Sequence, residues 1–161
     1  MLGAAILVLS DACSRGERPD LSGPAVREAL EARGWRVSPV EILPDDLPMI
    51  RQRLEVLTDS GACDMVVTAG GTGVGPRDVT PEATRAVVEK EIPGLAELMR
   101  AEGVKKTRRA VLSRGVAGVR KGRLIVNLPG SPRGARESLE IIADLLPHVV
   151  DLIQGRTAHR E

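Results

Sequence analysis

The strongest constraint on the fold is the order of two sequence patterns, because short apolar runs alternate with helical patterns along the chain. The first apolar run covers 4–9, and a helical pattern follows over 24–33. A half-apolar alternating stretch at 36–43 precedes a helix over 47–58, and another apolar, β-branched run lies at 65–68. This order predicts an α/β fold, in which a mainly parallel sheet has helices on both faces.

The second half of the chain adds a hairpin to this pattern. Two strand patterns, at 117–120 and 123–128, flank Lys121-Gly122, which is typical of a two-residue hairpin turn. Because hairpin strands are antiparallel, one of the two is expected to run against the rest of the sheet. The remaining helical patterns and the last apolar turn cover 81–90, 94–102, 132–146 and 149–153, with an interruption at Pro147.

Length and charge limit the classes of protein to consider. The chain has 161 residues and 42% hydrophobic composition, which suits a single domain over 1–161. Its net charge of +1 favours neither nucleic acid nor an anionic membrane as a partner. Trp35 is the only aromatic residue, so the chain lacks a platform on which bases could stack. Nucleic-acid binding is therefore not expected.

Two further features bear on location. The apolar run 2–9 is too short to cross a bilayer and continues into Ser10-Asp11, so a strand is expected there and no membrane anchor. Cys13 and Cys63 are isolated from each other, which fits a reducing cytoplasm and offers no zinc site.

One loop carries most of the chemistry that the sequence predicts. Residues 68–81, with the sequence TAGGTGVGPRDVTP, join a strand to a helix. Backbone N–H groups beside glycine can approach an anion closely, and a helix N-terminus adds partial positive charge. Arg77 and Asp78 place a guanidinium group and a candidate Mg²⁺ ligand next to this cradle. The loop is therefore a candidate phosphate and metal site; the alternative is a tight turn without a ligand.

Spacing excludes two familiar types of phosphate loop. A P-loop requires Gly-Lys-Ser/Thr after its glycines, whereas here Gly75 is followed by Pro76 and Arg77. A dinucleotide fingerprint begins at Gly71 and Gly73 but has Pro76 where its third glycine belongs. If the loop binds phosphate, it therefore belongs to another type of phosphate site.

Polar residues and glycines follow every strand predicted to be parallel. Ligands of open parallel sheets bind beyond the carboxyl ends of the strands, so these loops are expected to meet at one edge. Four helices also start there with capping and proline signals, at Ser22, Asp46, Thr80 and Ser131. Their N-termini attract anions, and Asp45 and Asp78 suit this edge if a cation lies between them and phosphate oxygens. Alternatively, Asp45 and Asp46 only cap a helix.

A basic stretch follows the loop region. The segment 100–123 contains one acidic residue, Glu102, among many lysines and arginines. Such a cluster can hold anionic groups. The run 105–109 is equally well explained as a solvated face, a subunit contact or a docking site for a partner enzyme, whereas Arg114, next to Ser113, is the stronger ligand candidate.

Several motifs then occur in a fixed order over nearly the whole chain. They are Ser10-Asp11, Asp20-x-Ser22-Gly23, Pro44-Asp45-Asp46, Thr68-Ala69-Gly70-Gly71-Thr72-Gly73, Arg77-Asp78-Val79-Thr80-Pro81-Glu82-Ala83-Thr84, Ile92-Pro93-Gly94, Glu97-Leu98-Met99-Arg100, Leu112-Ser113-Arg114 and Leu128-Pro129-Gly130-Ser131-Pro132. In this order they resemble the molybdopterin-binding proteins of molybdenum cofactor biosynthesis, a family that includes the molybdopterin adenylyltransferases.

The resemblance implies a three-layer α/β/α sandwich with a mostly parallel mixed sheet, a homotrimer or hexamer, and a pterin site at the strand ends. It implies that the terminal phosphate of molybdopterin attacks the α-phosphate of Mg-ATP, giving adenylylated molybdopterin and pyrophosphate. A metal-insertion enzyme acting downstream is the implied partner. A catalytically silent molybdopterin-binding or carrier protein of the same pathway is the alternative.

The expected site residues follow from the loops and the resemblance together. Asp45 and Asp78 are the expected catalytic and Mg²⁺-holding residues. The expected substrate- and phosphate-binding residues are Ser10, Asp11, Ser22, Gly23, Gly70, Gly71, Thr72, Gly73, Arg77, Thr80, Ser113, Arg114, Pro129, Gly130 and Ser131.

Overall fold

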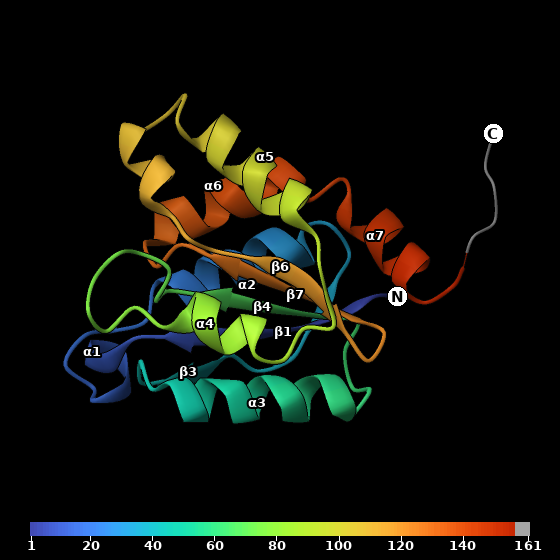
Figure 1. Cartoon of the computed structure of the whole chain (residues 1–161), viewed down its shortest axis with the longest axis horizontal. Coiled ribbons are helices and arrows are strands. Elements are labelled where there is room, and N and C mark those ends of the chain that lie inside the picture. Colours follow the sequence, from blue (N-terminus) through green and yellow to red (C-terminus); the bar gives the residue numbers. More distant parts are fainter. Residues whose placement is uncertain (157–161) are drawn as a thin grey trace.

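The structure, a computed structural model described over residues 1–156, is built around one seven-stranded sheet (Figure 1). Its strands are β1 (Gly3–Leu9), β2 (Arg36–Val37), β3 (Glu41–Leu43), β4 (Met65–Ala69), β5 (Lys90–Glu91), β6 (Ala117–Arg120) and β7 (Arg123–Leu128). The strand order is β2-β1-β4-β7-β6-β5, and β3 also pairs with β1. Residues 157–161, which the single-domain prediction included, lie outside the described residues.

Helices cover both faces of the sheet. They are α1 (Asp11–Ser14), α2 (Ser22–Glu31), α3 (Leu47–Asp59), α4 (Thr80–Arg85), α5 (Pro93–Gly103), α6 (Pro132–Ile142) and α7 (Leu146–Ile153), with a 3₁₀ helix η1 (Arg108–Leu112). Buried side chains of α2, α5, α6 and α7 share one core cluster with the sheet, and those of α3 and α4 share another. Figure 1 shows the same division, with α3 below the sheet and α5 and α6 above it. The predicted three-layer α/β/α sandwich is confirmed.

Strand β1 shows how the sheet separates the two cores. All seven of its residues are buried. Successive side chains of a strand point to opposite faces of the sheet. Ile6 and Val8 therefore pack in the core that α2 and α6 cover, whereas Leu7 and Leu9 pack in the core that α3 covers. A fully buried Leu or Ile stabilises a fold by roughly 1.5–3 kcal/mol, so this strand anchors both helical layers.

The mixed character of the sheet comes from the hairpin. Strand β1 pairs in parallel with β2, β3 and β4, and β4 pairs in parallel with β7. Strand β6 is antiparallel to both β7 and β5. At the turn, Lys121 and Gly122 have φ values of 50° and 74°, the left-handed conformation that a tight hairpin turn requires. The prediction that one hairpin strand runs against the sheet is confirmed.

The predicted strand 36–43 is two short strands, β2 and β3. The break contains Pro39, which has no N–H group to donate to β1. The N–H of Ser38 still donates to the Ala4 carbonyl, at 3.0 Å, before the pairing stops. Both short strands lie against β1, so the predicted position of this segment is correct although its continuity is wrong.

Two predicted helices are also shorter than expected. The helix predicted over 81–90 ends at Arg85, because the following backbone joins the sheet: the N–H of Glu89 donates to the Val119 carbonyl at 2.8 Å. The helix predicted over 132–146 ends at Ile142, and Pro147 lies in the first turn of α7 and does not interrupt a longer helix. Proline suits a first turn because its missing N–H has no helical partner there.

None of the helices in the described part of the chain has the length and apolar character of a membrane span.

Candidate functional site

The loops that follow β1, β3, β4 and β7 meet at one edge of the sheet. These strands are parallel to one another, so their carboxyl ends lie on the same side. The N–H of Gly70 donates to the Leu128 carbonyl at 3.1 Å, which joins the loop after β4 to the loop after β7. The Ser22 hydroxyl donates to the Gly130 carbonyl, which brings the start of α2 to the same place. The convergence that the sequence predicts is therefore present.

Two glycines let the loop after β4, residues 70–79 and hereafter the glycine loop, pass close to its neighbours. Gly70 has a φ of +106°, and a Cβ atom there would lie 2.2 Å from the Leu9 carbonyl oxygen. Gly71 has a φ of +68°, and its Cβ would lie 2.3 Å from Thr80 Oγ1 and 3.0 Å from Asp45 Oδ1. Only glycine fits either position, because both the conformation and the space exclude a side chain.

Asp45 presents one oxygen that has no protein partner. Its Oδ2 accepts a hydrogen bond from the Asp11 N–H at 3.1 Å, and the Asp45 N–H donates to Asp11 Oδ1 at 3.0 Å. Asp45 Oδ1 is buried and has no hydrogen-bond partner among residues 1–156, and the same is true of Thr80 Oγ1. Both oxygens border the position that a Cβ atom would occupy at Gly71. Since a buried oxygen is costly unless it is bonded, this pair of atoms marks a place for a ligand group.

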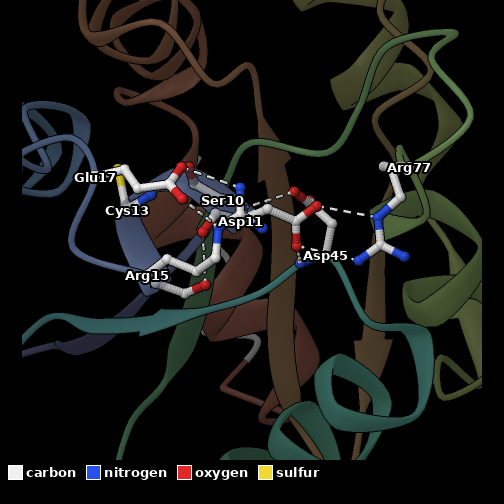
Figure 2. Close-up of polar contacts among 8 residues, drawn as sticks. Ser10, Asp11, Cys13, Arg15, Glu17, Asp45 and Arg77 are labelled. Carbon is white, nitrogen blue, oxygen red and sulfur yellow. Dashed lines mark hydrogen bonds and ion pairs between the residues drawn. The ribbon is translucent and has the colours of Figure 1, made fainter.

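An ion pair closes the outer side of this arrangement. Arg77 Nε and Nη2 donate to the two carboxylate oxygens of Asp11 at 3.0 and 3.1 Å. Figure 2 shows Asp11 next to Asp45, with Arg77 reaching toward them from the glycine loop. The Arg77 side chain is 66% exposed, whereas that of Asp11 is 22% exposed. Asp11 therefore holds Asp45 on one side and Arg77 on the other, and it has no oxygen free of protein contacts.

The two carboxyl groups differ in their electrostatics. The hydrogen bonds from Arg77 lower the pKa of Asp11, helped by the backbone N–H of Asp45. Burial raises the pKa of Asp45, and the nearby charges of Asp11 and Asp78 raise it further. Asp45 is thus a partly desolvated carboxylate that gains from a nearby cation, which is a common property of functional sites.

Removal of the Arg77 charge is expected to raise the pKa of both Asp11 and Asp45. The Arg77→Gln substitution deletes the guanidinium that stabilises the Asp11 carboxylate and that also attracts the Asp45 charge. A carbon-detected NMR titration of the two carboxyl groups measures this. In Arg77→Lys, which keeps the positive charge, the rise is expected to be smaller. Equal titration of both carboxyl groups in the wild-type protein and Arg77→Gln would contradict this electrostatic account.

Asp78 is held by its own loop. Its Oδ2 accepts a hydrogen bond from the Gly75 N–H at 2.8 Å. Its backbone carbonyl accepts one from Arg114 Nη2 at 3.0 Å. Arg114 reaches this loop from the segment between η1 and β6. The Asp78 carboxylate is therefore oriented while its remaining oxygen has no side-chain partner within the described residues.

Two cavities adjoin the glycine loop, and they share four residues: Gly71, Asp78, Gly130 and Ser131. The β1-side cavity, about 490 Å³, is lined by the ends of β1 and β4, the segment 18–22 and Asp45. The α5-side cavity, about 410 Å³, lies between the glycine loop, α5, η1 and α6. Its apolar wall includes Ala96, Met99, Leu112 and Ile141, and its cationic side chains are Arg100, Lys106 and Arg109. Such a cavity suits a flat apolar group that carries a negative charge.

Most of the predicted site residues line these cavities. The β1-side cavity is lined by Ser10, Ser22, Asp45, Gly70, Gly71, Asp78, Gly130 and Ser131, and the α5-side cavity by Gly71, Thr72, Gly73, Asp78, Ser113, Pro129, Gly130 and Ser131. The predicted residues that line neither cavity are Asp11, Gly23, Arg77, Thr80 and Arg114. Asp11, Gly23, Thr80 and Arg114 form hydrogen bonds with lining residues, and Arg77 pairs with Asp11.

Two of the four predicted helix caps are wrong. Asp46 Oδ1 accepts from the Met49 N–H and Ser131 Oγ from the Gly134 N–H, each at 3.0 Å, as caps do. Thr80 is the first residue of α4 and makes no cap, so its hydroxyl is left buried and unpaired.

Ser22 likewise does not cap α2. The carboxylate of Asp20 accepts a hydrogen bond from the Gly23 N–H at 3.0 Å, so Asp20 takes the role that was predicted for Ser22. The Ser22 hydroxyl is free to donate to Gly130.

Asn127, on the inner wall of the α5-side cavity, was not predicted as a site residue. Asn127, 2% exposed, lines this cavity, and its amide donates to the hydroxyls of Thr68 and Thr84 at 3.0 Å each. Its signal was available, because an asparagine inside the otherwise apolar strand β7 must find hydrogen-bond partners. Arg18 and Cys13, which line the β1-side cavity, were also missed as site residues.

Comparisons with known proteins agree with this geometry. The sequence model of a family described as "probable molybdopterin binding domain" matches residues 5–148. A molybdopterin adenylyltransferase from Helicobacter pylori (strain J99) is 44% identical over 154 residues, which are 93% of this chain and 86% of that protein. The molybdopterin adenylyltransferase of Escherichia coli K12 is 40% identical over 149 residues, covering 90% of this chain and 75% of that protein.

A solved structure supports the same relationship. The crystal structure of MoaB from Thermus thermophilus, described as a molybdopterin biosynthesis enzyme, has a TM-score of 0.91 and 52% sequence identity to this chain. The match covers 96% of this chain and 98% of that one. The chain therefore belongs to the molybdopterin-binding family of molybdenum cofactor biosynthesis proteins, the family that its ordered motifs resemble.

Proposed function

We propose that this protein is a molybdopterin adenylyltransferase, which transfers AMP from ATP to molybdopterin and releases pyrophosphate. An oxygen of the terminal phosphate of molybdopterin attacks the α-phosphorus of ATP and forms a new P–O bond. The bond from that phosphorus to the bridging oxygen breaks, and pyrophosphate leaves with the electron pair. The observation that supports this most strongly is the unpartnered, buried Asp45 oxygen beside Gly71, next to two cavities that share Gly71 and Asp78.

The two cavities provide room for two substrates on either side of the shared residues. In this proposal one cavity holds the pterin and the other the nucleotide, so that the reacting phosphates meet at the glycine loop. Holding two reactants in contact replaces a bimolecular encounter and contributes a large part of catalysis. The N-terminus of α6, capped by Ser131, adds partial positive charge where the phosphates meet.

The oxygen atoms at this place fit Mg²⁺. The ion prefers oxygen ligands and is often held by one or two carboxylates together with substrate phosphates. Asp45 and Asp78 would hold it, and no cluster of three or more His, Cys, Asp or Glu side chains within residues 1–156 offers a cage made of protein alone. When bound, the ion would neutralise the negative charge of the reacting phosphates.

The remaining parts of the proposal rest on the family resemblance. They are a single domain over 1–161, a homotrimer or hexamer, a location in the cytoplasm, and transfer of the product to a metal-insertion enzyme. The catalytically silent carrier is not favoured, because the relatives with 40–44% identity are named adenylyltransferases.

A pyrophosphate-release assay tests the proposed function. Purified protein with molybdopterin, ATP and Mg²⁺ is expected to release pyrophosphate, and omission of either substrate is expected to stop it. Asp78→Asn keeps the size of the side chain but removes its charge, so it is expected to lower turnover about 100-fold, the order of loss seen when one pre-organised group is removed. The Kd for molybdopterin should change by less than about threefold, because the cavities remain intact.

The same assay distinguishes the two functions. A silent carrier would bind molybdopterin with wild-type affinity and release no pyrophosphate beside an active control enzyme. That result would reject the proposed adenylyltransferase activity.

A further inference from the structure

The side chain of Arg114 contacts the glycine loop at two places and helix α4 at a third. Nε donates to the Gly73 carbonyl at 2.7 Å, Nη2 donates to the Asp78 carbonyl at 3.0 Å, and Nη1 pairs with Glu82 Oε1 at 2.5 Å. The backbone N–H of Arg114 donates to the Thr72 carbonyl at 2.8 Å. A planar guanidinium has its N–H groups in a fixed fork, so these contacts set the relative positions of the groups that accept them.

The segment that Arg114 holds, residues 73–79, is otherwise joined to a distant part of the described chain by the exposed ion pair of Arg77 with Asp11. Residues 74–77 are exposed and belong to no helix or strand. Within it, the Asp78 N–H donates to the Gly75 carbonyl at 3.1 Å, and the Gly75 N–H donates to the Asp78 carboxylate. These bonds stay within the segment and do not fix its place relative to the sheet. Arg77 joins it to Asp11 after β1 through an exposed ion pair, and the contacts from Arg114 at Gly73, Asp78 and Glu82 tie it to the rest of the protein from the other side.

Arg114 is itself held in place. Arg100 Nη1 donates to the carbonyls of Ser113 and Gly115, at 3.4 and 3.2 Å, and so fixes the backbone on both sides of Arg114. Arg100, Ser113 and Gly115 line the α5-side cavity, whereas Arg114 lines neither cavity. The Arg114 side chain is 34% exposed and is turned toward the glycine loop, away from the space where a substrate would lie.

We infer that Arg114 is a positioning residue: it holds the backbone of Asp78, and thereby its carboxylate, in the place required for AMP transfer, and it does not bind a phosphate as the sequence prediction has it. The inference rests on the proposed function. Displacement of a catalytic group by about 1 Å can lower the rate about 100-fold, so a residue that acts only through Asp78 can have a large effect on turnover.

Arg114→Lys tests this role, with Arg85→Lys on α4 as the matched control. Lysine keeps the charge but lacks the fork that reaches three acceptors. We expect Arg114→Lys to lower kcat about 10- to 100-fold, because a contact that orients Asp78 is lost. The KM values for ATP and molybdopterin should stay within about threefold of those of the wild-type protein. Arg85 is 54% exposed and pairs only with Glu91 in the described part of the chain, so Arg85→Lys should retain wild-type kcat. A rise in KM with unchanged kcat would show instead that Arg114 binds substrate.

A double-mutant cycle with Asp78→Asn separates the two explanations further. If Arg114 acts through Asp78, Arg114→Lys should lower kcat by less than about threefold in the Asp78→Asn background, because the effects of substitutions at coupled residues do not add. An equal loss in both backgrounds would overturn the inference. Glu82→Ala offers a second variant if Arg114→Lys folds poorly. It leaves the arginine with two of its three partners, and it should lower kcat, not raise KM.

Hydrogen exchange of the free protein tests the same contact without catalysis. Arg114→Lys should speed amide exchange in 73–79 while the exchange of β1 and β4 stays as in the wild-type protein. Unchanged exchange in 73–79 would overturn the inference. A wild-type protein without AMP transfer would reject the proposed function alone, since the exchange result still decides whether Arg114 holds this segment.

Discussion

Replacement of Asp45 by asparagine is expected to lower AMP transfer about 1,000-fold and to leave the fold at least as stable as before. Loss of one pre-organised charged group at a reacting phosphate costs on the order of 100- to 1,000-fold in rate, and Asp45 has a buried carboxylate oxygen in the proposed site. Asparagine keeps an oxygen that can accept the hydrogen bond from the Asp11 N–H.

The gain in stability follows from the raised pKa of Asp45. Burial makes the charged form unfavourable in the folded state, so ionisation costs free energy of folding once the pH exceeds the ordinary value of 3.8. Asp45→Asn removes this cost at neutral pH. At neutral pH the Tm of Asp45→Asn should therefore be at or above that of the wild-type protein. At a pH below 3.8 both side chains are neutral, and the difference in Tm should disappear.

Asp46→Asn is the matched control for Asp45→Asn. Asp46 caps α3 through the Met49 N–H, and asparagine caps a helix equally well, so both activity and Tm should stay close to those of the wild-type protein. Wild-type turnover in Asp45→Asn, or a loss of several degrees in its Tm, would contradict the role given to the Asp45 carboxylate.

Gly70→Ala is expected to be the most destabilising of the substitutions considered. Gly70 has a φ of +106°, and its new Cβ would lie 2.2 Å from the backbone oxygen of Leu9, which cannot move without disturbing β1. Backbone strain and overpacking together should cost about 3 kcal/mol or more of unfolding free energy. Thermal unfolding should show a Tm lower by roughly 6–12 °C.

Gly16→Ala provides the control for conformation without crowding. Gly16 also has a positive φ, of +73°, but no atom lies within 4 Å of its Cβ position. Gly16→Ala should lower the free energy of unfolding by only about 1–2 kcal/mol, which is the cost of the left-handed backbone alone. Equal losses in the two variants would mean that crowding against Leu9 adds nothing to the cost of a side chain at Gly70.

The sequence predicts the architecture well because its signals are local. The buried strands, the turn at Lys121-Gly122 and the polar residues after each parallel strand can all be read within a few residues. From these, the topology of parallel sheets brings Asp45 and Asp78 to one edge without any knowledge of contacts. The break at Pro39 was equally local, and a strict use of proline as a strand breaker would have found it.

Contacts between distant segments could not be predicted in the same way. Arg114 has its partners Gly73 and Asp78 about 40 residues earlier in the chain. Nothing in the spacing indicates that its guanidinium turns toward a loop. The caps at Ser22 and Thr80 failed for a related reason, because tertiary partners compete with local ones for a hydroxyl group.

We propose that Asp45, Asp78 and the glycine loop hold the phosphates that react. The most direct measurement is a crystal structure of the protein with molybdopterin, Mg²⁺ and α,β-methylene-ATP, in which the bond that would break is replaced by a stable one. We expect the α-phosphate at Gly71, the metal ion between Asp45 and Asp78, and the terminal phosphate of molybdopterin in line with the methylene group. Phosphates bound away from Gly71, with no cation at either carboxylate, would contradict the claim.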